Sequence, residues 1–191
     1  MKQNRNGIKR LLPLFLLTPM LVAGCAGLND RQLMADQVIY ESGVVVKRAD
    51  TKKAEFDQLV AEYKDTREGC HLQRMHALID LMQKDMELAA AFLDRGKYYP
   101  KGISLYRWQA VTHAHGLTGR HLCEMMLTTA ELEMIFADRE KAAALLERLL
   151  NTFPGEEFAG YREAARNRAD ELGQSCGVKE ARAAIETGGT Q

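Results

Sequence analysis

The sequence predicts an all-α domain in which amphipathic helices pack side by side. The clearest helix lies in residues 138–155, where apolar side chains recur at steps of three or four residues and a proline closes the pattern. Its first eleven residues, 138–148, repeat residues 85–95 with seven identities, 53 positions apart. An amphipathic helix cannot bury its apolar face alone, so two copies indicate a fold of stacked helices.

The overall composition, with 46% hydrophobic and 27% charged residues, is that of one folded domain and excludes a disordered chain. Residues 1–24 differ, because four basic residues precede an apolar run, 11–23, that is too short to span a membrane. This is the pattern of a signal peptide. Without it, 22 basic and 26 acidic residues remain, a net charge of −4. The absence of a basic cluster argues against nucleic acid as a partner.

Residues 21–25, Leu-Val-Ala-Gly-Cys, place small residues directly before a cysteine and resemble the lipobox of bacterial lipoproteins. The resemblance implies cleavage after Gly24 and attachment of acyl chains such as palmitate to Cys25. Two or more acyl chains are enough to hold a protein at a bilayer. Ala26, where an aspartate would favour the inner membrane of Gram-negative bacteria, implies the outer membrane, facing the periplasm. The alternative is a plain secretory signal whose cysteine is incidental.

The chain divides into four parts: a signal peptide at 1–24, a lipidated tether and N-terminal arm at 25–50, a helical-repeat domain at 51–175 and a C-terminal tail at 176–191. In the arm, β-branched runs flank Gly43, so residues 38–48 are open between an extended linker, a small hairpin and a packed arm. The glycine-containing end of the tail is expected to fray.

The helical pattern begins near Asp50 or Thr51, either of which is a suitable N-cap, and Gly69 interrupts it. The following stripe contains no breaker, but comparison of the two copies predicts a bend near residues 83–85. The residues of this stripe are Leu72, Met75, Ile79, Met82, Met86 and Leu93.

A turn at residues 97–102 leads to a helix expected to end at Gly116 and Gly119. Two helices at 121–136 and 138–153 follow, and a last helix comes after the turn at Pro154. The apolar stripe expected in the helix that follows the turn at 97–102 contains Ile103, Tyr106, Ala110, Ala114 and Leu117. The stripe expected in the last helix contains Phe158, Tyr161, Ala165, Ala169 and Leu172.

Residues 121–154 resemble a tetratricopeptide repeat, because the second helix opens with Asp-x-Glu-Lys-Ala and ends in Phe-Pro-Gly. Four residues match the consensus of that family, Ala130, Ala142, Leu146 and Pro154, whereas Glu133 and Leu149 depart from it. The resemblance implies antiparallel helical hairpins stacked as a short tetratricopeptide-like solenoid after an N-terminal lipoprotein signal peptide. The alternative is a set of unrelated helices that share an alanine-rich composition.

Such solenoids commonly bind partners in the groove that alternate helices line, so the resemblance implies a partner groove on residues 121–136. The candidate groove residues are the polar and methionine positions Glu124, Met125, Thr128, Glu131 and Met134. Each of these side chains could instead be solvated or part of the core.

Thiol and imidazole side chains gather near the turn expected at residues 116–119. The weak candidates for a zinc or copper site are His113, His115, His121 and Cys123, and a second group holds Cys70, His71 and His76. The spacing fits no known metal motif, so no cofactor is assigned. Cys70, Cys123 and Cys176 lie 53 residues apart, which favours equivalent buried positions but leaves one disulfide open.

The sequence contains no phosphate-binding loop, nucleophile elbow or dinucleotide turn, so we do not expect an enzyme. The favoured function is a lipid-anchored envelope adaptor or scaffold that acts through protein–protein interaction, with assembly of an outer-membrane or secretion complex as the expected role. It is similar in outline to the tetratricopeptide lipoproteins of the β-barrel assembly machinery and to pilotins. The alternative function is a small periplasmic metal- or ligand-binding lipoprotein.

Overall fold

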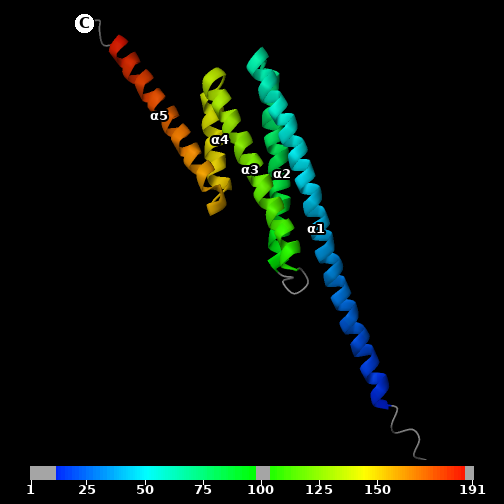
Figure 1. Ribbon diagram of the computed structural model, residues 1–191. Coiled ribbons are helices and arrows are strands. Elements are labelled where there is room, and N and C mark those ends of the chain that lie inside the picture. Colours follow the sequence, from blue (N-terminus) through cyan, green and yellow to red (C-terminus); the bar gives the residue numbers. More distant parts are fainter. Residues whose placement is uncertain (1–11, 98–103, 188–191) are drawn as a thin grey trace, which may run out of the picture.

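The computed structural model describes the backbone of residues 12–97 and 104–187, and the side chains of residues 32–95, 104–105 and 107–173. Every element in the described part is helical, which confirms the all-α class. The elements are α1 (Leu12–Thr66), α2 (Gly69–Lys97), α3 (Leu105–Phe136), α4 (Arg139–Thr152), the short 3-10 helix η1 (Glu156–Phe158) and α5 (Ala159–Thr187). Successive α-helices run antiparallel to one another (Figure 1).

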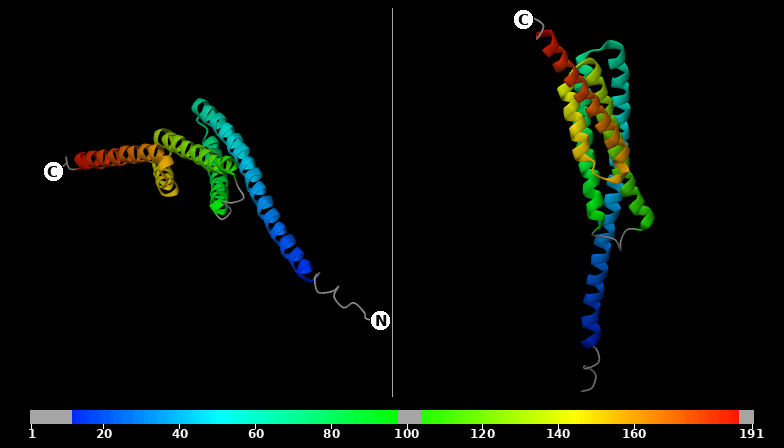
Figure 2. Two further views of the ribbon diagram at one scale, coloured as in Figure 1. Left: turned by 60° about the horizontal axis from the view of Figure 1, so that its bottom comes forward. Right: turned by 90° about the vertical axis from the view of Figure 1, so that its left-hand side faces the viewer.

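Consecutive α-helices pack against each other, and α3 packs against all four of the others. Helix α1 contacts α2 and α3, helix α2 contacts α3, and helix α3 contacts both α4 and α5. Helices α4 and α5 also pack together, whereas among the described residues the backbones of α2 and α4 do not approach each other, and Arg148 of α4 reaches Asp80 of α2 across the space between them. Figure 2 shows the result, with α2 and α4 on one side of the molecule and α1, α3 and α5 on the other. Helix α3 is therefore the central element.

The main core lies along α3, and the apolar stripes that the sequence predicts for the neighbouring helices pack into it. Met75 and Met82 of α2 and Leu149 of α4 are fully buried in it, as is Phe56 of α1. The unbranched thioether side chains of the methionines adapt to the irregular spaces between long helices. Burial of each such side chain contributes roughly 1.5–3 kcal/mol, so these stripes provide the main driving force for helix packing.

Residues 38–48 are helical, so the extended linker and the hairpin considered for them are both wrong. Helix α1 continues through this segment and beyond Asp50, which therefore caps no helix. The reason is a stripe of small and β-branched residues that α2 and α3 cover. Its members are Ala35, Val38, Ser42, Val45 and Ala49. The Ser42 hydroxyl donates to the Val38 carbonyl at 2.7 Å, so its burial leaves no donor unpaired.

Helix α2 runs without interruption across residues 83–85, so the predicted bend there is wrong. Asp85, the counterpart of Asp138 in the internal repeat, lies in mid-helix and is 5% exposed. Its carboxylate pairs with Lys52 and, at 2.6 Å, with Arg48, both from α1. The same residue type thus joins two helices in the first copy and begins a helix in the second.

Helix α3 also continues where a break was expected, at Gly116 and Gly119. Its 32 residues are about twice the length that a 34-residue, two-helix repeat allows for one helix. Gly119 is fully buried because the Phe158 ring packs directly on it, and a Cβ atom at this position would lie 2.5 Å from Phe158 Cζ. The expected stripe in this helix is also corrected, since Ala110 is exposed and Val111 is buried instead.

Helix α4 and the turn after it follow the prediction. Asp138 is the N-cap of α4, and Phe153 ends the helix one residue before Pro154. Arg162 of α5 stabilises the turn, because its guanidinium donates to the Phe153 carbonyl at 2.8 Å and to the Gly155 carbonyl. Helix α5 extends to Thr187, so the backbone of most of the predicted C-terminal tail is helical.

Substitution of Gly119 by alanine tests the contact between α3 and η1. We expect Gly119→Ala to lower the free energy of unfolding by about 1–3 kcal/mol, because the added methyl group meets the Phe158 ring in a packed interior. Chemical denaturation measures this change. The matched control is Gly43→Ala in α1, where nothing lies within 4 Å and alanine should stabilise the helix by up to about 1 kcal/mol. Equal stabilities of the two variants would contradict the contact.

Candidate partner-binding cleft

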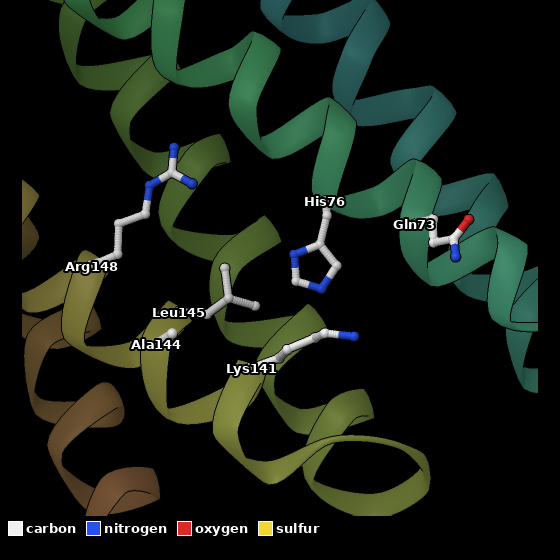
Figure 3. Close-up of a pocket in the computed structure, with 6 residues that line it drawn as sticks. All are labelled: Gln73, His76, Lys141, Ala144, Leu145 and Arg148. Atoms are coloured by element: carbon white, nitrogen blue, oxygen red, sulfur yellow. The ribbon is translucent and has the colours of Figure 1, made fainter.

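A cleft of about 470 Å³ lies between α2 and α4, the two helices that pack on α3 while their own backbones stay apart. The following residues line it: Gln73, His76, Lys141, Ala144, Leu145 and Arg148. Figure 3 shows the His76 ring projecting from α2 toward Lys141 and Leu145 of α4. We refer to this feature as the α2–α4 cleft. Its lining combines an apolar surface with three nitrogen-bearing side chains that carry or can accept positive charge.

A buried carboxylate lies beside the α2–α4 cleft and ties its two walls to α3. Glu133 of α3 has a side chain only 3% exposed, and its Oε1 lies 2.8 Å from Nε2 of His76. Its Oε2 accepts the backbone N–H of Asp138 at 3.2 Å, immediately before α4. A buried carboxylate is costly unless both oxygens have donors, and here each has one. The position of both cleft walls therefore depends on Glu133.

The α4 wall begins at Asp138, whose Oδ1 accepts the backbone N–H groups of Glu140 at 3.0 Å and Lys141 at 3.3 Å. These two hydrogen bonds hold the pKa of Asp138 below its ordinary value, and the bond from Lys141 has the larger effect. At the rim, Arg148 pairs with Asp80 of α2 at 2.7 Å, and Lys141 lies 3.6 Å from Asp138. Both rim pairs are largely exposed, so a carboxylate from another molecule could replace Asp80 or Asp138 with little loss of stability.

The candidate groove residues of α3 lie on a different surface, between α1 and α5. Met125 is fully buried in the main core and is not available to a partner. Glu124 accepts from the Tyr161 hydroxyl at 3.0 Å, and Glu131 accepts from the Arg168 guanidinium at 2.7 Å, so both carboxylates are already paired with α5. Thr128 and Met134 are half-buried, and Met134 packs against the core. The five residues do not form an open groove.

Partial burial of Tyr161, together with its hydrogen bond to Glu124, raises the pKa of the phenol to about 12. The hydroxyl therefore stays protonated and donates to Glu124 throughout the physiological range. This bond and the Arg168 pair hold α5 against α3 at two points, about two helical turns apart, one on either side of Ala165.

The four weak metal candidates do not meet. One uninterrupted helix carries all of them, and their spacing distributes them around its axis. His113 is exposed, the His115 ring packs 6.2 Å from that of Phe158, and His121 lies 3.1 Å from Asp50. Burial lowers the pKa of His115 and raises that of Cys123 to about 12, which keeps the thiol protonated. A metal site at these residues would require a turn that α3 does not have.

The cysteines at intervals of 53 residues are not equivalent. Cys123 is buried, Cys70 is exposed, and both have free thiols, so no disulfide joins them. The Cys25 and Cys176 side chains lie outside the described ones, and lipidation of Cys25 remains a prediction. Among the described residues, none of the helices combines the length and apolar character that crossing a bilayer requires.

Sequence reasoning missed the α2–α4 cleft, although one signal for it is visible. Lys141 and Arg148 are seven residues apart, and Ala144 lies between them on the side of α4 opposite to Leu146. This spacing indicates a second, mixed face on the helix. The partners on α2 lie about 70 residues earlier, and only the packing of both helices on α3 brings them near.

No protein-family model, no curated protein and no solved structure matches this chain.

Removal of the buried carboxylate tests its role in holding the cleft walls. We expect Glu133→Ala to lower the free energy of unfolding by about 1–3 kcal/mol, because two partly buried donors, of His76 and Asp138, lose their acceptor. The control is Glu55→Ala, which removes a 3.2 Å surface pair with Arg74 and should change stability by less than about 1 kcal/mol. Urea denaturation of both variants measures the difference. A Glu133→Ala loss no larger than that of the control would refute the role assigned to Glu133.

The N-cap of α4 predicts a specific pH dependence. Because the pKa of Asp138 is lowered in the folded state, its contribution to stability is present above the ordinary aspartate pKa of about 3.9 and is lost as the pH falls through the lowered value. We therefore expect Asp138→Ala to melt at a lower temperature than the wild type at pH 7, with the gap narrowing below about pH 3.9. Asp138→Asn, an uncharged cap, should keep most of the stability without this narrowing. A difference in melting temperature between Asp138→Ala and the wild type that stays constant with pH would contradict this prediction.

Proposed function

We propose that this chain is a lipid-anchored adaptor of the bacterial envelope that binds a partner protein through the α2–α4 cleft. The observation that carries the proposal is the cleft itself, which has an apolar floor at Ala144 and Leu145 and a basic rim at Lys141 and Arg148. The lipobox-like segment before Cys25 supports anchoring, with the outer membrane, facing the periplasm, as the proposed location.

The order of helix packing supports a stacked, tetratricopeptide-like arrangement. Each described α-helix contacts only its nearest neighbours in sequence, up to two positions away, as expected when hairpins stack in one direction. In such a stack the second and fourth helices form one outer surface, and a groove remains between them. The lengths of α2 and α3, 29 and 32 residues, depart from the regular repeat, so we propose a divergent, short solenoid.

The chemistry of the cleft limits the kind of partner. The apolar floor favours a partner segment with an aliphatic or aromatic side chain, since such anchors provide most of the energy at interfaces. The rim favours carboxylates, which would replace Asp80 at Arg148 and Asp138 at Lys141. We therefore propose an acidic, amphipathic segment of an envelope protein as the partner. The predicted alternative, a metal-binding protein that uses His113 to Cys123, has no converging donors to support it.

Site-specific photo-crosslinking in living cells tests the adaptor function. A photoreactive residue at exposed Ala144, on the cleft, should capture one envelope protein, and adding Lys141→Glu should abolish the capture by reversing the rim charge. The matched control places the same group at exposed Asn167 of α5, outside the cleft. The Cys25→Ala form should lose the capture because it is not anchored.

Two results would count against the proposal. Equal capture from Ala144 and Asn167 would mean that the cleft has no special role in binding. Absence of any captured protein from Ala144, with the protein folded and present at the membrane, would remove the adaptor function.

A further inference from the structure

The turn between α1 and α2 brings together three side chains of the types that bind transition metals. Cys70 Sγ lies 3.6 Å from Glu68 Oε2, and His71 Nε2 lies 3.8 Å from the same oxygen. One ligand atom of each residue lies within 4.8 Å of the other two, the only such group of three in the described residues. This group is far in sequence from the α2–α4 cleft residues of α4 and shares none of its lining.

The turn has a defined backbone geometry. Arg67 adopts a positive φ of 60°, which ends α1, and its N–H donates to the Tyr63 carbonyl at 2.9 Å. The Arg67 guanidinium lies 3.5 Å above the Phe136 ring of α3, so the turn is also attached to the rest of the fold. His71 N–H donates to the Glu68 carbonyl at 3.1 Å, which closes the first turn of α2 around the three side chains.

The two distances to Glu68 match those required for one tetrahedral ion, and the Cys70 and His71 ligand atoms lie within 4.8 Å of each other. Zinc bonds of about 2.0–2.3 Å to carboxylate, imidazole and thiolate place neighbouring ligand atoms roughly 3.3–3.8 Å apart. The separations of 3.6 and 3.8 Å fall in this range. Three protein ligands would leave the fourth position for a water molecule or for a group from another molecule.

A fourth residue supports the orientation of the histidine. Nδ1 of His71 is buried and forms no hydrogen bond, but Oε2 of Glu62 lies 3.4 Å away from it. Histidine ligands in proteins usually donate the N–H of their second nitrogen to a carboxylate, which fixes the tautomer and the ring. Glu62 stands where such a carboxylate is needed, with His71 Nε2 directed to the side of Glu68 and Cys70.

We propose that Glu68, Cys70 and His71 form a zinc site, with Glu62 as the carboxylate that orients His71. Binding displaces the proton of the Cys70 thiol, because the thiolate is the ligand. The ion joins the last turn of α1, through Glu62 and His71, to the first turn of α2. Zinc therefore stabilises the α1–α2 hairpin in addition to any role of its open fourth position.

Competitive titration tests the site in the full-length protein under reducing conditions, with a chromophoric chelator as competitor for zinc. We expect the wild type to bind one equivalent that Cys70→Ser and His71→Ala both lose. Glu62→Gln should bind about 10–100-fold more weakly, as loss of a carboxylate behind a histidine ligand does. Cobalt replaces zinc in a second measurement, where a thiolate-to-cobalt charge-transfer band should appear in the wild type and be absent from Cys70→Ser.

The matched control is His113→Ala, which removes an exposed histidine of α3 and should leave zinc affinity and the cobalt band unchanged. Zinc should also raise the melting temperature of the wild type and of this control, but not that of Cys70→Ser. Circular dichroism confirms that each variant is folded. The site would be overturned by a wild type that takes up no zinc, by uptake that survives both Cys70→Ser and His71→Ala, or by a cobalt complex without the thiolate band.

Discussion

Glu133 places a carboxylate at the meeting point of three helices, and the relative positions of those helices depend on it. Its two oxygens contact His76 of α2 and the backbone N–H of Asp138, which begins α4, while its own backbone belongs to α3. A helix N-terminus carries a partial positive charge, so the start of α4 is a favourable neighbour for this side chain. An apolar residue here would fill space but would not specify where α2 and α4 stand. We infer that Glu133 determines the width of the α2–α4 cleft.

Other polar contacts add to this arrangement from both sides of the central helix. Asp85 holds α1 against α2 through Arg48 and Lys52, and Glu124 and Glu131 hold α5 against α3. The apolar stripes provide most of the packing energy but little orientation, because methionine and leucine adapt to many neighbours. The carboxylates of Asp85, Glu124 and Glu131 restrict how neighbouring helices can be placed, because each must meet donors on another helix. This division explains how helices of such unequal length form one ordered stack.

The two proposals concern neighbouring parts of the N-terminal half of α2: the turn before the helix and the cleft wall that contains His76. A zinc ion at Glu68, Cys70 and His71 would hold the start of α2, and the lining of the cleft begins at Gln73, two residues after His71. An ordered first turn of α2 would also hold the His76 side of the cleft in place. The zinc site and the adaptor function are independent, however, since neither shares a binding residue with the other.

Local sequence was enough to determine the helical class, the apolar stripes of α2 and α4, the break near Gly69 and the end of α4 before Pro154, because spacing and helix-breaking residues act within a few positions. It was misleading where tertiary contacts outweighed local preference. Val38 and Val45 are helical because α2 and α3 bury them, and Gly119 lies within a helix because Phe158 occupies the space of its missing side chain. The similarity of residues 85–95 to residues 138–148 was also misleading, because it suggested equivalent roles for Asp85 and Asp138. Asp85 lies inside a helix, whereas Asp138 precedes one. Only the tertiary structure decided the cleft, because it depends on the directions in which two separate helices present their side chains. For Cys70 and His71, which the sequence already grouped, the turn geometry decided that Glu68 and not His76 is their neighbour.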